Sequence, residues 1–297
     1  MSDVRRADGF VVVDKPAGIT SHRLIASLKH QLGGSVKIGH AGTLDSFASG
    51  VLVVLLGRYT RLSDWFMGAG KEYDAMVAFG RETDTLDPEG AVTAQAEPPS
   101  LDALNAALPR FRGDILQAPP AYSAVHIDGQ RAYERAAKGE DVRPEPRPVT
   151  IKALELLSFD GANARLRIVC SKGTYIRSLA RDLALACGSR AHLSALRRVA
   201  SGPFLADGAL KPGDVGEQAL RSLAVADAIG LGLAVVTLDA EQARAFTGGL
   251  PLYRLAPFKD KPKGGDAAVY SEGGTLLGMV RAKDSVWAYG MVFEGAR

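Results

Sequence analysis

The chain has 297 residues, of which 46% are hydrophobic and 23% charged, and its net charge is +3. This composition is that of a globular protein, and the length favours one large domain followed by a smaller one. Apolar runs stay well below the roughly 18–20 residues of a membrane helix, and the first residues lack a signal-peptide core. We therefore expect a cytoplasmic protein with no membrane partner. Cys170 and Cys187 lack the ligand spacing of a zinc site, so we expect no metal.

The first quarter of the chain predicts two strands and two helices. Residues 9–13 predict a strand, 14–18 a turn, and Thr20 or Ser21 can cap the helix that follows. Residues 50–57 form a continuous apolar run without polar alternation, which is typical of a buried strand. Residues 58–67 then predict a helix.

Further along the chain, apolar residues alternate over 73–79 and again over 163–171, which predicts two more strands. Residues 83–90 (TDTLDPEG) predict turns, 101–111 a helix, and the prolines of 139–148 a loop. The helix after Thr174 carries Arg177 and Arg181 on one face, because they are four residues apart. After about residue 235, short apolar runs and glycine pairs predict a small β domain.

Residues 165–198 carry a stripe of eight basic residues against one acid, Asp182. These basic residues are Arg165, Arg167, Lys172, Arg177, Arg181, Arg190, Arg197 and Arg198. Such a basic stripe fits a phosphate-binding surface, and it also fits a solvated helix face. The sequence pattern alone leaves both interpretations open.

One carboxylate, Asp45, lies between a glycine-containing turn and the apolar run 50–57. Gly42 and Gly50, on either side, permit close approach of the backbone. A carboxylate in this place can be a nucleophile, a general base or a structural cap. A nucleophile would have to stay ionised in a partly closed pocket, which a nearby arginine favours. Arg177 is a candidate for that arginine, although spacing alone does not place it there.

Residues 39–52 (GHAGTLDSFASGVL) closely resemble the catalytic motif of the bacterial tRNA pseudouridine synthase B family. Further stretches resemble that family's motifs in the same order, and they are 14–22, 71–90, 117–140, and 170–184 together with 193–204. The resemblance spans about residues 9–205. Thr43, Leu44 and Asp45 favour this family over related pseudouridine synthases, which carry Arg-Leu-Asp at this point.

The resemblance implies an α+β fold, in which helices flank a central mixed, largely antiparallel sheet. It implies a catalytic domain over residues 1–235 and a small, β-rich, PUA-like RNA-binding domain over 236–297. The implied reaction isomerises uridine 55 in the T-loop of tRNA to pseudouridine by base flipping, without a cofactor or metal. The implied partner is the T-arm stem-loop of tRNA. We also expect a monomer that needs no obligatory protein partner.

The resemblance also implies roles for particular residues. Asp45 would be the nucleophile, Tyr73 would stack on the flipped uracil, and Arg177 would hold Asp45 ionised. Leu196 would line the pocket, and His40 would help to displace the uridine. The residues expected to support the catalytic loop are Lys15, Pro16, Gly42, Thr43 and Leu44. The residues expected to contact RNA are Lys172, Arg181, Arg197 and Arg198. In the C-terminal part, Lys259, Lys261 and Lys263 fit an RNA contact and a solvated loop equally well.

Four positions depart from the pattern common in the family. Ala41 and Ser49 each replace a usual threonine, Ser46 replaces a usual proline, and His126 replaces a common lysine. None of these changes removes a catalytic group. Ser46 could loosen the turn after Asp45, and His126 could weaken one RNA contact near neutral pH.

Two other functions remain open on the sequence. One is a tRNA-binding and folding factor whose catalysis is secondary or lost, although Asp45, Tyr73 and Arg177 are intact. The other is a pseudouridine synthase that acts on a different RNA or is guided by a partner. The chain lacks long basic tails, which argues against this second alternative.

Overall fold

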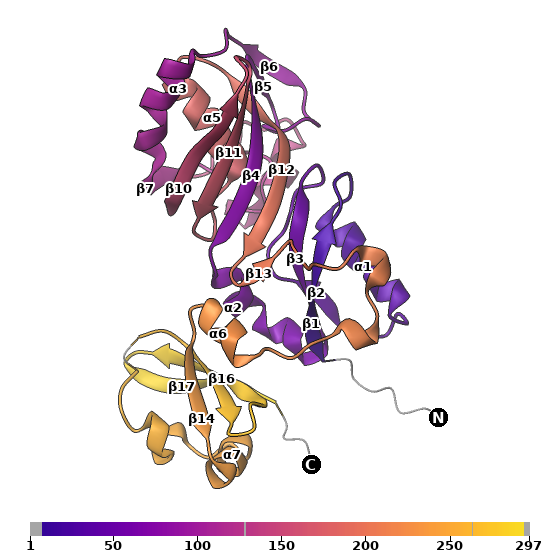
Figure 1. The fold of residues 1–297 in the computed structure, drawn as a ribbon, viewed down its shortest axis with the longest axis vertical. Coiled ribbons are helices and arrows are strands. Elements are labelled where there is room, and N and C mark those ends of the chain that lie inside the picture. Colours follow the sequence, from indigo (N-terminus) through magenta and orange to yellow (C-terminus); the bar gives the residue numbers. More distant parts are fainter. Residues whose placement is uncertain (1–7, 128, 263, 294–297) are drawn as a thin grey trace.

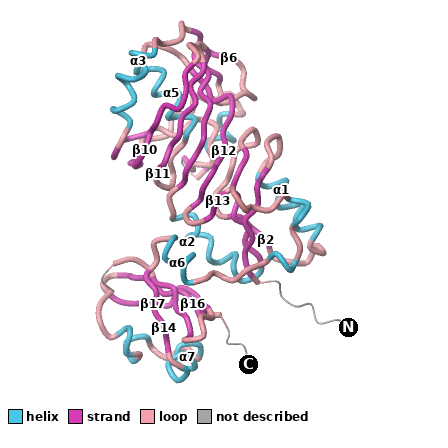
Figure 2. Tube along the Cα trace, viewed as in Figure 1, coloured by secondary structure: helices cyan, strands magenta, loops and turns pink. Residues whose placement is uncertain are grey.

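The structure is a computed structural model that describes residues 8–127, 129–262 and 264–293. Figure 1 shows an elongated molecule with a large sheet in its upper part and a smaller C-terminal sheet at its lower end. Figure 2 shows the helices gathered around the large sheet and at the ends of the small one. Within the described ranges, the helices are too short or too polar to span a membrane.

The large sheet is mixed and largely antiparallel, which confirms the predicted fold class. Its main path runs through β1 (Gly9–Lys15), β3 (Ser49–Leu56), β12 (Ala191–Ser201), β4 (Lys71–Phe79), β11 (Asn163–Cys170), β10 (Arg147–Phe159) and β7 (Gly113–Gln117). The short strands β2 (Ile38–His40) and β13 (Phe204–Leu205) pair with β3 and β12. β3 and β12 run parallel, and the other neighbours on the path are antiparallel.

Strand β3 is buried along almost its whole length because both of its faces are covered. Its even-numbered residues from Leu52 to Leu56 pack against Leu24 and Leu28 of α1 (Ser21–Gln31). Its odd-numbered residues from Val51 to Leu55 lie in a second cluster with Phe66 of α2 (Ser63–Gly68). This double burial explains the unbroken apolar run in the sequence. It also anchors the segment that carries Asp45, which directly precedes the strand.

The helix starts agree with the capping residues in the sequence. The Thr20 hydroxyl caps α1 by accepting a hydrogen bond from the Arg23 amide at 3.1 Å. Helix α5 (Ile176–Ala186) buries Ile176, Leu179 and Leu183 in the same core as β4 and β11. Figure 1 shows α3 (Leu101–Ala107) beside α5, on the same side of the large sheet.

The remaining short elements form loops and edges around the large sheet. They are β5 (Arg81–Thr83), β6 (Val92–Gln95), β8 (His126–Ile127), β9 (Gln130–Arg131) and α4 (Ala132–Ala136). Helix α6 (Val225–Gly230) packs instead against the C-terminal sheet (Figure 1). The predicted helix at 58–67 is a 3₁₀ turn (Gly57–Leu62) followed by α2. The predicted helix at 101–111 likewise ends in a 3₁₀ turn (Leu108–Phe111). The predicted strand at 9–13 continues to Lys15, so the turn begins later than expected.

The C-terminal part forms a β-rich sheet that is consistent with a PUA-like domain. The order of its strands is β14 (Ala234–Leu238), β15 (Ala267–Ser271), β16 (Leu276–Lys283) and β17 (Val286–Val292). Helix α7 (Ala240–Thr247) contributes Phe246 to a core under this sheet. The C-terminal part contacts α2, where the Trp65 indole donates to Asp266 at 2.7 Å. The Tyr270 hydroxyl of β15 also donates to the carbonyls of Leu223 and Ala224, just before α6, at 3.2 Å. Strand β14 starts just before the expected domain boundary at 235–236, and the division itself stays a prediction.

Candidate active site

The loop that carries Asp45 runs from Ala41 to Ala48 and is fixed from below by two buried side chains. The Ser21 hydroxyl, at the start of α1, bonds both the amide and the carbonyl of Leu44 at 2.9 Å. The Lys15 ammonium donates to the carbonyls of Pro16, Ile19 and Ser46 at 3.0, 2.7 and 3.4 Å. Burial lowers the pKa of Lys15 to about 8. Lys15 therefore lies under the loop and touches the residue that follows Asp45.

Two glycines let the loop enter β3 in this conformation. Gly42 has a φ of +98° and Gly50 a φ of +107°, values that side-chain-bearing residues rarely adopt. A Cβ atom at Gly50 would lie 2.2 Å from the Arg198 carbonyl oxygen. Glycine at position 50 therefore allows β3 and β12 to approach each other directly after the loop.

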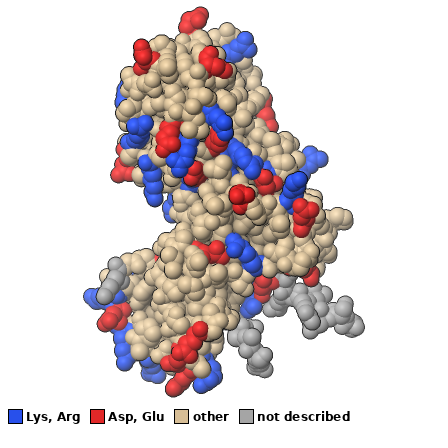
Figure 3. Space-filling view, viewed as in Figure 1, with Lys and Arg blue, Asp and Glu red and all other residues tan. Residues whose placement is uncertain are grey.

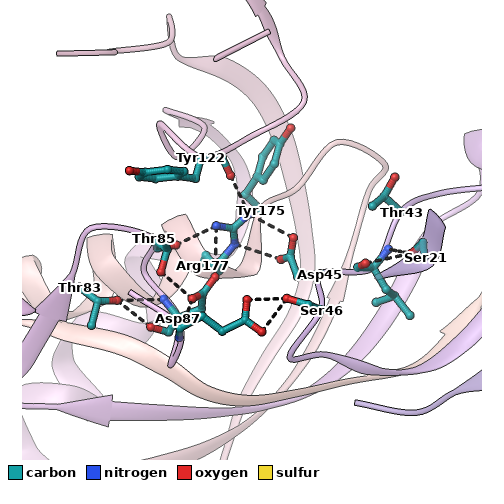
Figure 4. Close-up of polar contacts among 12 residues, drawn as sticks. Ser21, Thr43, Asp45, Ser46, Thr83, Thr85, Asp87, Tyr122, Tyr175 and Arg177 are labelled. Carbon is teal, nitrogen blue, oxygen red and sulfur yellow. Dashed lines mark hydrogen bonds and ion pairs between the residues drawn. The ribbon is translucent and has the colours of Figure 1, made fainter. Parts of the chain in front are cut away.

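Asp45 pairs with Arg177, as the resemblance implies. Figure 4 shows the two side chains facing each other across the site. The Arg177 guanidinium holds the carboxylate through both oxygens, with Nε to Oδ2 at 3.0 Å and Nη2 to Oδ1 at 3.2 Å. The Arg177 side chain is 7% exposed, whereas that of Asp45 is 37% exposed. The arginine is thus buried, and the carboxylate that it holds is partly exposed to solvent.

Arg177 is itself fixed by the loops on either side of it. Its guanidinium donates to the carbonyls of Thr85 at 2.7 Å and Tyr122 at 2.9 Å. It also lies 3.6 Å from a second carboxylate, Asp87, whose side chain is 8% exposed. The arginine is therefore oriented before any substrate binds, which is the arrangement that catalysis by preorganised charges requires.

Asp87 is a site residue that the sequence analysis missed. Its carboxylate accepts hydrogen bonds from the Thr85 hydroxyl at 2.5 Å and the Glu89 amide at 3.0 Å. The Thr83 hydroxyl bonds the backbone of Asp87 on both its amide and carbonyl. We interpreted residues 83–90 as turns, yet they place a carboxylate behind Arg177. The signal was present in the two threonines that precede Asp87, since short hydroxyl side chains stabilise such turns.

The replacement Ser46 makes a contact that proline could not make. Its hydroxyl bonds the Glu89 carboxylate, at 2.7 Å to Oε1 and 2.5 Å to Oε2 (Figure 4). The turn after Asp45 is thereby tied to the loop that carries Asp87. We expected Ser46 to loosen this turn, and in the structure its side chain adds a tether to it.

Burial and Arg177 have opposite effects on the pKa of the Asp45 carboxyl. Burial is the larger influence and raises the pKa of the Asp45 carboxyl above its ordinary value. The Arg177 charge acts in the opposite direction, while Asp87 and Glu89 raise the pKa further. Arg177 therefore favours the ionised form of Asp45, whereas burial, Asp87 and Glu89 disfavour it.

Tyr73 and Leu196 lie on neighbouring strands and share one apolar cluster with Leu44 of the Asp45 loop. Tyr73 is 8% exposed and Leu196 is 7% exposed. Burial raises the pKa of the Tyr73 phenol, and the Arg198 charge opposes that rise. The structure thus places an aromatic ring and an aliphatic side chain in the same cluster as Leu44, which directly precedes Asp45.

His40 ends β2 and directly precedes the Asp45 loop. Its Nδ1 atom is buried and has no hydrogen-bond partner among the described residues. Burial lowers the pKa of His40, and the Arg198 charge lowers it further, so the neutral imidazole is favoured. The structure thus places an uncharged His40 side chain directly before the Asp45 loop.

Arg198 does not offer its charge to RNA, so that expectation is wrong. The residue is 2% exposed, and its guanidinium donates to the carbonyls of Gly42, Thr43 and Val51. Its side chain extends from β12 inside the protein to the loop that carries Asp45. The sequence pattern suggested exposure because arginine is rarely buried completely.

The basic stripe at 165–198 is largely neutralised by acids from neighbouring segments. Apart from Arg177, which pairs with Asp45 and Asp87, the ion pairs of the stripe are Arg165 with Asp74, Arg167 with Glu72 and Glu155, Arg181 with Asp182, Arg190 with Glu82, and Arg197 with Asp14. Figure 3 shows acidic and basic side chains interspersed over the upper part of this face, not a continuous basic band. Lys172 is exposed and forms no ion pair within the described ranges. The stripe therefore gives little net charge for RNA.

A different basic surface surrounds α1, and we call it the α1 surface. Its exposed residues are His22, Arg23, Lys29, His30, Lys37 and Arg61. They form no ion pairs within the part of the chain that the structure describes. The sequence between Lys15 and Ser63 contains a single acid, Asp45 itself. The unpaired positive charge therefore lies on the same segment as the candidate nucleophile.

Other predicted positions lie away from this centre. His126 is exposed on β8, and Lys259 and Lys261 are exposed near the C-terminal sheet. Lys263 lies outside the described residues. Cys170 and Cys187 are free thiols. Among the described residues, no group of three or more histidine, cysteine, aspartate or glutamate side chains is arranged to hold a metal ion.

Comparison with known proteins agrees with this geometry. A family model described as the N-terminal domain of TruB family pseudouridylate synthase matches residues 29–176. A tRNA pseudouridine synthase B from Bordetella parapertussis is 45% identical over 68% of this chain and 84% of its own length. One from Burkholderia mallei is 41% identical over 96% of each chain.

Solved structures give the same result at the level of the fold. A chain from the crystal structure of a Cbf5–Nop10–Gar1 complex is 27% identical, with a TM-score of 0.70 over 98% of this chain and 84% of that chain. A chain from the archaeal box H/ACA Nop10–Cbf5 complex is 24% identical, with a TM-score of 0.69 over 97% of this chain and 87% of that chain. Taken with the curated relatives, these matches show that the chain belongs to the tRNA pseudouridine synthase B family of pseudouridylate synthases.

Proposed function

We propose that the chain isomerises uridine 55 in the T-loop of tRNA to pseudouridine, with Asp45 as the nucleophile. The observation that carries the proposal is the pairing of a partly exposed Asp45 carboxylate with the buried Arg177 guanidinium. This pair lies beside an apolar cluster that contains Tyr73. Membership of a tRNA pseudouridine synthase family supports tRNA as the substrate.

The proposed reaction exchanges one bond of the uridine for another. The bond from C1′ of the ribose to N1 of the uracil breaks, the detached base rotates, and a bond from C1′ to C5 forms. The proton on C5 leaves, and N1 gains a proton, so the product is an isomer of the substrate. Asp45 forms a temporary bond to the nucleotide and is regenerated at the end. The proposal needs no cofactor.

The apolar cluster beside Asp45 suits a flipped base. A uridine inside a folded RNA loop has to leave its stack before the glycosidic bond can be reached, and flipping costs a few kcal/mol. Stacking on an aromatic side chain offsets about 1–3 kcal/mol per base. Tyr73 is the aromatic residue that we propose for this role. We also propose that Leu196 lines the pocket and that the neutral His40 takes the place in the RNA loop that the flipped uridine leaves.

We propose that the α1 surface, in place of the neutralised stripe, contributes most of the positive charge that meets the tRNA backbone. RNA helices are bound largely through their shape and their phosphates. Lys172 and the exposed lysines beside the C-terminal sheet would extend this contact. We also propose that residues 236–297 act as a separate RNA-binding domain, and that the protein works in the cytoplasm as a monomer without an obligatory protein partner.

Carbodiimide primer extension tests the reaction and its site together. An unmodified tRNA transcript is incubated with the protein, and pseudouridine is read as a stop in reverse transcription. We expect a stop at uridine 55 in the full tRNA and in an isolated T-arm hairpin. A transcript with cytidine at this position is the matched control and should give no stop.

Two results of this experiment would contradict the proposal. Stops at other uridines but not at position 55 would favour a synthase directed to another site or RNA. No stop at all, together with tight tRNA binding, would favour a tRNA-folding factor that lacks catalysis.

A further inference from the structure

Arg198 is a completely buried cation that the described part of the chain provides with no carboxylate partner. Its three donor nitrogens instead meet backbone carbonyl oxygens. Nη2 and Nη1 donate to Gly42 and Thr43, at 3.0 and 3.3 Å, just before Asp45. Nε donates to Val51 at 2.7 Å, just after the loop enters β3. One side chain therefore holds both ends of the loop that carries the nucleophile.

The backbone of Arg198 joins the same loop to the stacking residue. On β12, Arg198 lies directly opposite Tyr73 of β4 on one side and opposite Gly50 of β3 on the other. The contact with Gly50 is so close that a Cβ atom there would overlap the Arg198 backbone. Burial raises the pKa of the Tyr73 phenol, and the Arg198 charge opposes the rise. Arg198 is thus the neighbour of Tyr73 in the sheet, while its guanidinium holds the loop.

A residue with a purely structural role would not need a guanidinium at this buried position. Moving a guanidinium out of water costs several kcal/mol unless hydrogen bonds replace the lost solvation. Apolar residues of similar volume often fill such positions without loss of stability. The planar guanidinium, however, presents several donors in a fixed arrangement, which suits three carbonyls that come from different segments. The same group carries a full charge and stems from the residue that pairs with Tyr73 in the sheet.

We propose that Arg198 is a positioning residue for the isomerisation, which fixes the Asp45 loop and the Tyr73 hydroxyl in one geometry through a single guanidinium. This inference rests on the proposed function, because it assigns Arg198 to the same reaction. It replaces the RNA contact that the sequence suggested. Arg198 acts on the chemical step through Asp45 and Tyr73 and makes no contact with the tRNA.

A double-mutant cycle tests this coupling. The variants are Arg198→Lys, Tyr73→Phe and the combination of both, and the readout is the single-turnover rate of pseudouridine formation at saturating enzyme. Lysine keeps the charge but cannot reach three carbonyls with a fixed fork. We expect Arg198→Lys to slow the rate by at least about tenfold, with the tRNA Kd changed by less than about threefold. In the Tyr73→Phe background, we expect the same substitution to have at least about a threefold smaller effect.

The control is Arg112→Lys, because Arg112 also donates to a backbone carbonyl, that of Leu154, far from Asp45. Its rate should stay within about threefold of wild type. Rates are normalised to the fraction of each variant that binds tRNA, and Arg198→Gln provides a neutral second variant. If neither Arg198 variant binds tRNA or folds, Arg198 serves the fold alone and the proposal is overturned.

Two further outcomes would also overturn the inference. Equal rate losses in the wild-type and Tyr73→Phe backgrounds would show that Arg198 does not act through the phenol. A loss of tRNA affinity that matches the loss of rate would return Arg198 to RNA binding. The wild-type protein in the same assay separates this failure from failure of the proposed function, because a wild type that forms no pseudouridine would overturn both.

Discussion

Replacing Arg177, whose guanidinium binds both carboxylate oxygens of Asp45, should change the pH at which the protein becomes active. The proposed reactive form is the Asp45 carboxylate, so activity is lost as the pH falls through the pKa of Asp45. Burial raises this pKa and Arg177 opposes the rise. Substituting Arg177 with lysine or methionine therefore raises the pKa further. The acidic limb of the rate profile should move to higher pH in both variants.

The size of the shift follows from the contacts. Arg177 gives Asp45 two charge-assisted hydrogen bonds, at 3.0 and 3.2 Å, and lysine can give one. One such bond contributes about 1.5–3 kcal/mol when buried. Because the Asp45 side chain is 37% exposed, solvent screening reduces this contribution to the lower end of that range. At about 1.4 kcal/mol per pKa unit, Arg177→Lys should move the limb by roughly one unit, and Arg177→Met by more.

The assay is release of tritium from C5-labelled uridine in tRNA, measured in single turnover from acidic to weakly alkaline pH. Arg181→Met is the control, because Arg181 lies one turn further along the same helix and pairs with Asp182. It should leave the acidic limb in place. An acidic limb at the same pH in wild type, Arg177→Lys and Arg177→Met would refute the reasoning, since Arg177 would then have no influence on the reactive carboxylate.

Three further predictions follow from the geometry. Tyr73→Ala should lower the single-turnover rate by about 10- to 100-fold, because it removes the stacking ring, worth about 1–3 kcal/mol, as measured by tritium release. Gly50→Ala should lower the thermal midpoint and the rate together, because its Cβ would lie 2.2 Å from a backbone oxygen at a φ of +107°. The double substitution Arg23→Ala and Lys29→Ala on the α1 surface should weaken tRNA binding and reduce the slope of log K against log salt by about two. Lys152→Ala, which removes an exposed lysine of β10, is the control.

Each of these predictions has a result that would contradict it. An unchanged rate in Tyr73→Ala would make this residue part of the core only. A Gly50→Ala variant with wild-type melting would show that β3 and β12 can separate without cost. An unchanged salt slope in the α1 surface variant, or an equal change in the Lys152 control, would move the RNA interface elsewhere.

The elements that the sequence predicted best are those whose burial is local. Strand β3 was predictable because Leu52 and Val53 face opposite sides and both sides are buried. The cap of α1 was predictable because Thr20 satisfies an amide three residues away. Strand β12 was not predicted, and β10 begins at Arg147, inside a segment whose prolines suggested a loop. The partners of β12, which are β3 and β4, lie far away in the sequence, whereas β10 pairs with β11 directly after it and with β7 before it.

In the site, too, contacts between residues that lie far apart in the sequence could not be predicted from local patterns. The Asp45–Arg177 pair came from the family resemblance, because 132 positions separate the two residues and no local pattern joins them. The basic stripe was misleading because most of its acids lie on other segments, as with Asp74 of β4, which forms an ion pair with Arg165 of β11. Arg198 was misjudged because three remote carbonyls satisfy it, and carbonyl positions leave no trace in a sequence.

The central claim is that Asp45 performs the chemistry and is not needed for docking. The most direct measurement compares wild type and Asp45→Asn for tritium release from C5 and for tRNA binding, with Asp102→Asn, an exposed aspartate of α3, as the control. The account predicts that Asp45→Asn releases no detectable tritium and that the control releases it normally. It also predicts that the tRNA Kd of Asp45→Asn stays within about tenfold of wild type, which is about 1.4 kcal/mol of binding free energy. Release of tritium by Asp45→Asn at a rate close to that of wild type would contradict the assignment of Asp45 as the nucleophile.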